Sequence, residues 1–448
     1  MPPSFLSRLA AAPACMALMP AGLLLLAAGA PLVSMLVPRF LGTLPLACAG
    51  LCLIGSGFGA RLRPLPDRRL ILAVAGFLAL CAASAIWAVD PGFVLERVAK
   101  MTYTAVAGLV LWMAAIRIDP VWLRRIGVVF CVSVALAGVL LLEEMTGHLV
   151  YRAVRGLSET APVSPHALNR EAVVLATLIW PTLPLIAAGP LLMRWPRPLR
   201  QGLAILAPLV LALALFRTES QSAMAGILVG AAVYALAVAM PPAWVRRVLL
   251  AGIIAGLVSA PLWGQGLQAM QPRLITSVRG AAVGARMEIW DAVARRALER
   301  PVLGWGLEVV RTFSHAALFD RPVRHMRNRP LTLHPHNGAL QIWIELGGIG
   351  VLAASGLLLL LGRRIAGFAR AMQPAALAGL AALSLMAVVS HGLWQSWWLG
   401  LISTAITGFA LAGRAIALWD GRQKPEEVPL SDPERHGPSV SAQKDASP

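Results

Sequence analysis

The sequence is dominated by apolar runs of about twenty residues that contain almost no charged side chains. Hydrophobic residues make up 58% of the chain and charged residues 13%, whereas a soluble domain has about 25% charged residues. Too few polar side chains remain to cover a water-soluble globule of 448 residues. Runs of this length are what a helix needs to cross a hydrocarbon core of about 30 Å. The chain is therefore predicted to be an all-α polytopic membrane protein.

Twelve such runs divide the chain. They lie at about 10–30, 40–60, 70–88, 95–116, 122–142, 171–192, 201–216, 220–240, 248–263, 338–361, 374–392 and 396–418. The predicted organisation is an N-terminal block of about nine spans (1–263), a large polar loop (264–337), a C-terminal block of about three spans (338–418) and a polar tail (419–448). The tail is rich in Pro, Ser and charged residues, so we expect it to be disordered.

The basic residues indicate the orientation. With a cytoplasmic N-terminus, the inside segments carry 19 bases and the short outside segments seven, as the positive-inside rule requires. Both termini are then cytoplasmic and the loop 264–337 lies outside. That loop has 11 Arg against five acids, and its charge favours anionic partners. Nucleic acid is not expected, because the other bases are scattered between apolar runs.

Within the loop, residues 286–300 have the periodicity of an amphipathic helix. Its apolar face is predicted to contain Ile289, Trp290, Val293, Ala294, Ala297 and Leu298, and its polar face Glu288, Asp291, Arg295, Arg296 and Glu299. Pro301 should end the helix, and Gly304-Trp305-Gly306 should form a turn. We expect the helix to lie along the outer membrane face; simple packing on the bundle is the alternative.

A second feature is His334-Pro335-His336-Asn337, directly before an apolar run. Asn337 is placed to cap that helix, whose first N–H groups favour an anion nearby. His336 at the helix mouth is a candidate general base, because its ordinary pKa of about 6.5 suits proton transfer. The alternatives are a solvated pair of loop histidines or a metal site. Metal is disfavoured, because the loop is cationic and lacks HExxH or Cys spacing.

The third feature is the short outside connection Arg217-Thr218-Glu219-Ser220-Gln221-Ser222. Charged groups at the membrane are costly without a partner, so Arg217 and Glu219 are functional candidates. Snorkelling to the interface, or mutual pairing at a helix end, is the structural alternative.

These motifs together resemble the O-antigen ligase superfamily. RMEIWDAVARRALERPVLGWG followed by HPHNGALQIWIELGGIGVL is similar to its signature, and the early SAIWAVDP resembles its Trp-x-x-Asp-Pro. The family usually also has an Arg in a Ser-Arg pair after its seventh span. Here that pair is Ser220-Gln221, and Arg217 upstream is the candidate for the role.

The resemblance implies a glycosyltransferase of the bacterial inner membrane whose site faces the periplasm. It would move O-antigen from undecaprenyl diphosphate to the lipid A–core oligosaccharide by an inverting displacement, without a metal or other cofactor. The resemblance implies that Arg286 and Arg217 bind the donor diphosphate and that His336 activates the acceptor, with His334, Asn337 and Trp290 in support.

Other functions were weighed against this one. A polysaccharide polymerase of the same superfamily would use the same donor, and the sequence separates it poorly from a ligase. A twelve-span secondary transporter is disfavoured, because transporters place ionisable residues near the bilayer midplane, often in repeated halves. An envelope-assembly scaffold would need neither a base nor a diphosphate clamp.

Overall fold

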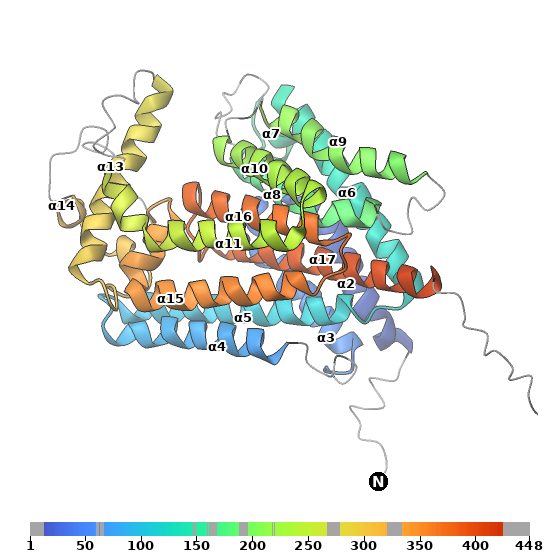
Figure 1. Cartoon of the computed structure of the whole chain (residues 1–448), viewed down its shortest axis with the longest axis horizontal. Helices are drawn as coiled ribbons and strands as arrows, with labels where there is room; N and C mark the ends of the chain where they lie inside the picture. Colours follow the sequence, from blue (N-terminus) through green and yellow to red (C-terminus); the bar gives the residue numbers. More distant parts are fainter. Residues whose placement is uncertain are drawn as a thin grey trace, which may run out of the picture.

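The computed structural model describes residues 13–59, 62, 67–146, 149–158, 160, 168–187, 196–216, 218, 220–266, 278–319 and 334–423. Within these residues the secondary structure is entirely helical. Most of the long helices run side by side in a bundle (Figure 1). The prediction of an all-α membrane protein is confirmed at this level.

Every predicted span coincides with a helix. The long helices are α2 (Pro13–Ser34), α4 (Arg68–Ala83), α5 (Pro91–Ala115), α6 (Pro120–Thr146), α8 (Asn169–Ala187), α9 (Arg197–Leu215), α10 (Gln221–Ala239), α11 (Pro242–Val258), α15 (Gly338–Ala366), α16 (Gln373–Val389) and α17 (Ser396–Gln423). The shorter elements are η1 (Pro38–Gly42), α3 (Leu44–Gly55), η3 (Ser84–Ile86), α7 (Leu149–Arg155), α13 (Val278–Glu299), η5 (Val309–Arg311) and α14 (His315–Leu318).

Not all of these helices are long enough to cross a bilayer alone. Nine of the described helices have the length and apolarity of a span, and α11 with Ala260–Gly266, bent by 68°, makes a tenth if the pair is one span. The helices α3 and α16 are apolar but shorter. In the predicted second span, a 3₁₀ turn beginning at Pro38 precedes the helix, and this leaves α3 only 12 residues.

The core of the bundle surrounds α8. In this helix 83% of the residues of the apolar segment are buried, against 11% in α4. Trp180 of α8 is fully buried and lies so close to Gly230 of α10 that a Cβ there would be 2.2 Å from the indole. Large apolar side chains on the outer helices remain exposed, such as Leu72 (70%) and Leu352 (72%). This distribution fits a bundle whose periphery faces lipid.

The helix α15 is kinked at Gly347, whose φ is +60°. The kink frees carbonyl groups that the segment after α13 uses as acceptors. Trp305 N–H donates to the Ile344 carbonyl (2.8 Å) and Gly306 N–H to the Glu345 carbonyl (2.9 Å). The loop residues that follow α13 are thereby fixed against the N-terminal half of α15.

Glycine is required where these segments cross. At Gly304 (φ +67°) a Cβ would lie 2.6 Å from the Glu345 carbonyl carbon, and at Gly306 (φ +98°) 2.5 Å from the Ala88 Cβ. The Leu307 N–H donates to the Ser84 hydroxyl at 3.2 Å. The early motif around Ser84–Pro91 and the late Gly-Trp-Gly turn are therefore in direct contact.

Candidate active site

The helix α13 places Arg286 at one end of the bundle. It ends at Glu299, directly before Pro301 as predicted, and Figure 1 shows it crossing the direction of the bundle helices at that end. Two assignments to its faces are wrong. Leu298, near the end of the helix, is 44% exposed, whereas Glu288 is only 3% exposed. Contacts with the bundle, and not the helical period alone, decide burial at these positions.

Trp290 joins this helix to the histidine motif. Its Nε1–H donates to the Pro335 carbonyl at 3.0 Å, and its ring meets that of Trp263 edge-on at 6.0 Å. The indole therefore holds the segment around Pro335 against α13. This contact brings the two halves of the predicted signature together.

Asn337 caps α15 as predicted. Its Oδ1 accepts from the Leu340 N–H at 3.0 Å, and the residue is completely buried. His336, just before it, has a left-handed φ of +53°, a conformation that is uncommon outside glycine. The Asn337 cap and the strained backbone of His336 together set the orientation of the His336 imidazole at the N-terminus of α15.

The hydrogen bonds of His336 define its tautomer. Its Nδ1 lies 2.8 Å from the Ser390 carbonyl oxygen, which can only accept, so Nδ1 carries the proton and Nε2 keeps its lone pair. The backbone N–H of His336 donates to Nδ1 of His334 at 3.2 Å. The two rings lie 4.2 Å apart. His334 therefore contacts both the backbone and the ring of His336.

Ser390, between α16 and α17, connects three parts of the chain. Besides accepting from His336, it receives a hydrogen bond from the Ser222 hydroxyl (3.1 Å). Its own hydroxyl shares a hydrogen bond of 2.8 Å with Nε2 of His391. Ser222 belongs to the connection singled out in the sequence, so the described part of that connection reaches the same site. His391 itself packs edge-on against Trp397 at 4.7 Å.

Burial and positive charge keep the histidines neutral. Desolvation and the charge of Arg286 lower the pKa of His336, and the hydrogen bond that its Nδ1–H donates to the Ser390 carbonyl opposes this shift. Burial, followed by Arg170, His336 and Arg286, lowers the pKa of His391 to about 3. Burial likewise lowers the pKa of Arg286, whose guanidinium remains the charged form at neutral pH.

His334 is also neutral. Burial is the main cause that lowers its pKa to about 3, and the nearby His336, His391, Arg311 and Arg170 add to it. The site is therefore a cluster of uncharged imidazoles among guanidinium groups.

The structure thus brings together most of the predicted site residues. Arg286, Trp290, His334, His336 and Asn337 lie at the same end of the bundle. Arg217 and Glu219 lie outside the described residues, so their roles stay predictions.

Sequence reasoning missed three contributors. Ser390 and His391 stand in no recognisable motif, and Arg170, noted only as an outside base, approaches the Trp397 ring at 5.9 Å. The only sequence signal for His391 is a histidine between two apolar runs.

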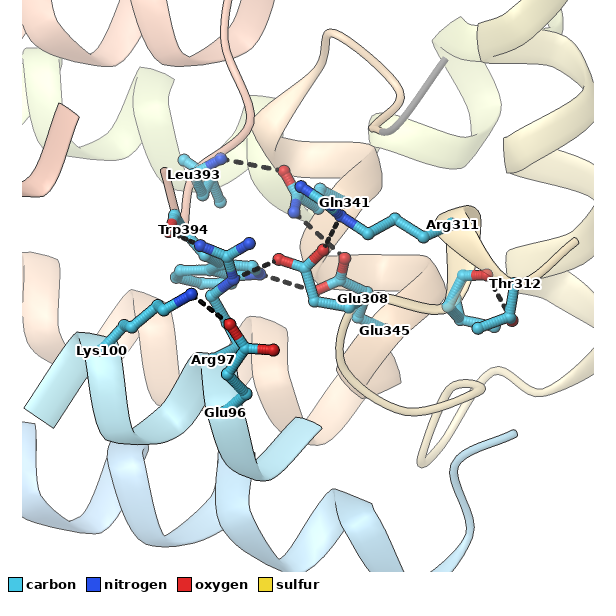
Figure 2. Close-up of polar contacts among 11 residues, drawn as sticks. Glu96, Arg97, Lys100, Glu308, Arg311, Thr312, Gln341, Glu345, Leu393 and Trp394 are labelled. Carbon is cyan, nitrogen blue, oxygen red and sulfur yellow. Dashed lines mark hydrogen bonds and ion pairs between the residues drawn. The ribbon is translucent and has the colours of Figure 1, made fainter. Parts of the chain in front are cut away.

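A buried ionic network joins the segments that carry the site (Figure 2). Glu308, 7% exposed, pairs with Arg97 at 2.6 Å and with Arg311. Arg97 Nη1 also donates to the Trp394 carbonyl at 2.9 Å. The network ties α5 and the segment after α13 to the connection that carries Ser390 and His391.

The same connection is anchored to α15. The Leu393 N–H donates to Gln341 Oε1 at 3.0 Å, and Trp394 Nε1 donates to Glu345 Oε2 at 2.6 Å. Gln341 donates in turn to Glu345 at 3.0 Å. These bonds fix the position of the Ser390 carbonyl relative to His336.

Across the described residues, no group of three or more His, Cys, Asp or Glu side chains is arranged to hold a metal ion. The described polar groups of the site include guanidinium cations and the Nε2 atom of His336, which carries a lone pair in the tautomer assigned above. Such a set can bind an anion and accept a proton.

Comparisons with known proteins show which family this chain resembles. Residues 206–355 match the family model described as O-antigen ligase, a stretch that includes Arg286 and His336. A protein of Rickettsia conorii, provisionally named a polysaccharide ligase, is 26% identical over 185 residues, which are 41% of this chain and 44% of that protein. A similarly named protein of Rickettsia typhi is 30% identical over 122 residues, 25% of this chain and 28% of its own.

The match spans less than half the length of these relatives. No solved structure matches the chain. The order of the motifs along the chain, the helical membrane architecture and the family match all point to the same superfamily. Residues 206–355 are therefore similar to the O-antigen ligase family, and the names of the relatives support the same superfamily.

Proposed function

We propose that this protein is an inner-membrane glycosyltransferase that moves O-antigen polysaccharide from undecaprenyl diphosphate to the lipid A–core oligosaccharide at the periplasmic face. The superfamily and the names of the relatives support transfer of a polysaccharide. The neutral histidine and the neighbouring arginine at one end of the bundle support a diphosphate-linked donor and a hydroxyl acceptor.

The observation that carries the proposal is the geometry of His336. A backbone carbonyl holds its Nδ1–H at 2.8 Å, so Nε2 is the basic nitrogen, and the lowered pKa of His336 keeps it unprotonated. An imidazole oriented in this way can accept a proton from an acceptor hydroxyl. The arrangement resembles the general-base half of a catalytic dyad, with a carbonyl as the orienting group.

Arg286 would bind the donor. In the proposed step the acceptor oxygen forms a bond to the anomeric carbon while the bond from that carbon to the diphosphate oxygen breaks. The departing diphosphate takes the electron pair, and His336 takes the proton. Arg286 stabilises the charge that grows on the phosphate, together with Arg217. A single displacement inverts the anomeric centre, and no metal is required for it.

Transfer with purified components tests the proposal. The full chain is incubated with an undecaprenyl-diphosphate glycan and lipid A–core in the presence of a chelator. We expect product from the wild type and a loss of roughly 10²–10⁴-fold in rate for His336→Ala, the range for removal of a general base. His315→Ala is the matched control and should retain activity. His315 begins α14 in the same polar segment, and its ring lies at a tilted angle 4.7 Å from that of Phe319.

Three results would each contradict one part of the proposal: the general base, the metal-free step or the acceptor. Wild-type rates from His336→Ala would exclude the base. Loss of product on chelation would exclude the metal-free step. Elongation of a second lipid-linked glycan, with lipid A–core left unmodified, would identify a polymerase.

A further inference from the structure

A cavity of about 440 Å³ lies at the opposite end of α15 from His336. Its walls come from the start of α4 and the end of α15: Asp67, Arg68, Arg69, Leu360, Arg363, Arg364 and Gly367. The 29 residues of α15 make a helix of about 43 Å at ~1.5 Å per residue. The cavity is therefore separated from the candidate active site by about the thickness of a membrane.

The cavity has an excess of positive charge. It is lined by four arginines and one acid, and Asp67 Oδ1 already accepts from the N–H groups of Arg69 and Leu70 as a helix cap. Among the described residues, no carboxylate forms an ion pair with any of the four guanidinium groups. An anion in the cavity would relieve the mutual repulsion of these arginines.

The surroundings of the cavity indicate what kind of anion fits. One turn further into the bundle, Leu72 of α4 is 70% exposed and Leu359 of α15 is 49% exposed, and Leu360 lines the cavity itself. A free phosphate would satisfy only the arginines. A phospholipid would place its phosphate in the cavity and its acyl chains on the exposed leucines.

We propose that this cavity binds the phosphate headgroup of an anionic phospholipid, such as cardiolipin or phosphatidylglycerol, in the leaflet away from the active site. Basic pockets between the ends of spanning helices are suited to such headgroups. The lipid would fasten α4 to α15, the helix whose other end begins beside His336. The proposal concerns a separate site and does not depend on the reaction catalysed at the other end.

Lipid titration of the purified full chain tests this inference. Native mass spectrometry and thermal unfolding in neutral detergent are recorded with added cardiolipin, with phosphatidylcholine and with inorganic phosphate alone. We expect cardiolipin to bind and to raise the unfolding temperature, and the other two to do neither. The double variant Arg68→Gln/Arg363→Gln removes one exposed guanidinium from each wall. It should bind cardiolipin on the order of tenfold more weakly or worse, given the usual contribution of a basic residue at an anionic membrane.

The matched control is Arg246→Gln/Arg247→Gln in the first turns of α11. It removes the same charge from residues that do not line the cavity, and it should keep wild-type affinity. If cardiolipin affinity fell equally in both double variants, the effect would be due to general surface charge, and the proposal would be overturned. Equal stabilisation by inorganic phosphate would overturn it in favour of a soluble anion site. If the double variant does not fold, Arg363→Gln alone is tested, and unchanged cardiolipin affinity in either variant overturns the proposal.

Discussion

The tautomer of the His336 imidazole is fixed by a contact with a residue that is distant in the sequence. The motif around it predicts a histidine at a helix mouth, and Asn337 predicts the cap. The group that fixes the tautomer is the backbone carbonyl of Ser390, which is 54 residues further along the chain. Any residue type can supply a carbonyl, so no pattern in the sequence identifies it.

The lowered pKa of His336 predicts an unusual pH profile for transfer. A base must be unprotonated, so activity falls only when the pH drops through the pKa of the folded protein. Burial and Arg286 hold this pKa below the ordinary value of 6.5. A solvated histidine would be half protonated at about pH 6.5. We expect the rate at pH 6.5 to have fallen by less than the half that such a histidine would show. Initial rates from about pH 7.5 to 6.5, at saturating donor and acceptor, provide the measurement.

The variant Arg286→Gln removes the positive charge and should raise the pKa of His336, which moves the acidic limb of the profile to higher pH. Its rate should also fall, because a donor contact is lost. Arg296→Gln on the same helix pairs with Glu299 and is the control that should leave the limb in place. An unmoved limb in Arg286→Gln would disprove the electrostatic link between the two residues.

At the scale of elements, the kink of α15 and the turn after α13 form one interlocked unit. The sequence predicts an end of the helix before Pro301, which is confirmed. It also predicts a turn at Gly304-Trp305-Gly306, where the structure has a bend at Trp305 that follows a turn at Pro301–Leu303. It does not predict that Gly347 breaks α15, because glycines are frequent in spanning helices. The need for Gly304 and Gly347 arises from their close mutual approach, which becomes visible only when the elements pack.

We expect Gly304→Ala to destabilise the folded protein by about 1–3 kcal/mol, because alanine is strained at positive φ and its Cβ would meet the Glu345 carbonyl at 2.6 Å. Gly356→Ala in the same α15 is the control. No atom lies within 4 Å of its added Cβ, and alanine in a helix interior is favoured over glycine by roughly 0.5–1 kcal/mol. Unfolding of both variants in detergent gives the comparison. Equal stability of the two would contradict the interlocked arrangement.

For the whole molecule, apolar run length predicts nearly every helix, because a helix buried in lipid must satisfy its own backbone hydrogen bonds. The charge pattern predicts orientation but not packing. It does not show that α8 is central, or that Arg170 and His391 join the site, because those depend on which helices are neighbours. Trp290 was predicted only as a supporting residue on the apolar face of its helix, whereas the structure gives it a defined hydrogen-bonding role.

Cysteine accessibility tests the orientation. Val302→Cys, at a position 61% exposed beside the candidate site, should react with a membrane-impermeant maleimide added to spheroplasts. Arg370→Cys, in the exposed connection between α15 and α16, should react only after the membrane is disrupted. The native Cys48, Cys52 and Cys81 are buried, so the unmodified chain provides the background. The reverse pattern of labelling would place the active site in the cytoplasm.

The contact between His336 and Ser390 also limits how the protein can be divided. The stretch that matches the family model ends at residue 355, whereas the carbonyl that orients the imidazole belongs to residue 390. A transplant of the matched stretch into another scaffold would carry the histidine without its orienting partner, and the ring would be free to rotate and exchange tautomers. Chimaeras between relatives should therefore exchange α16 and α17 together with the loop, as a single unit.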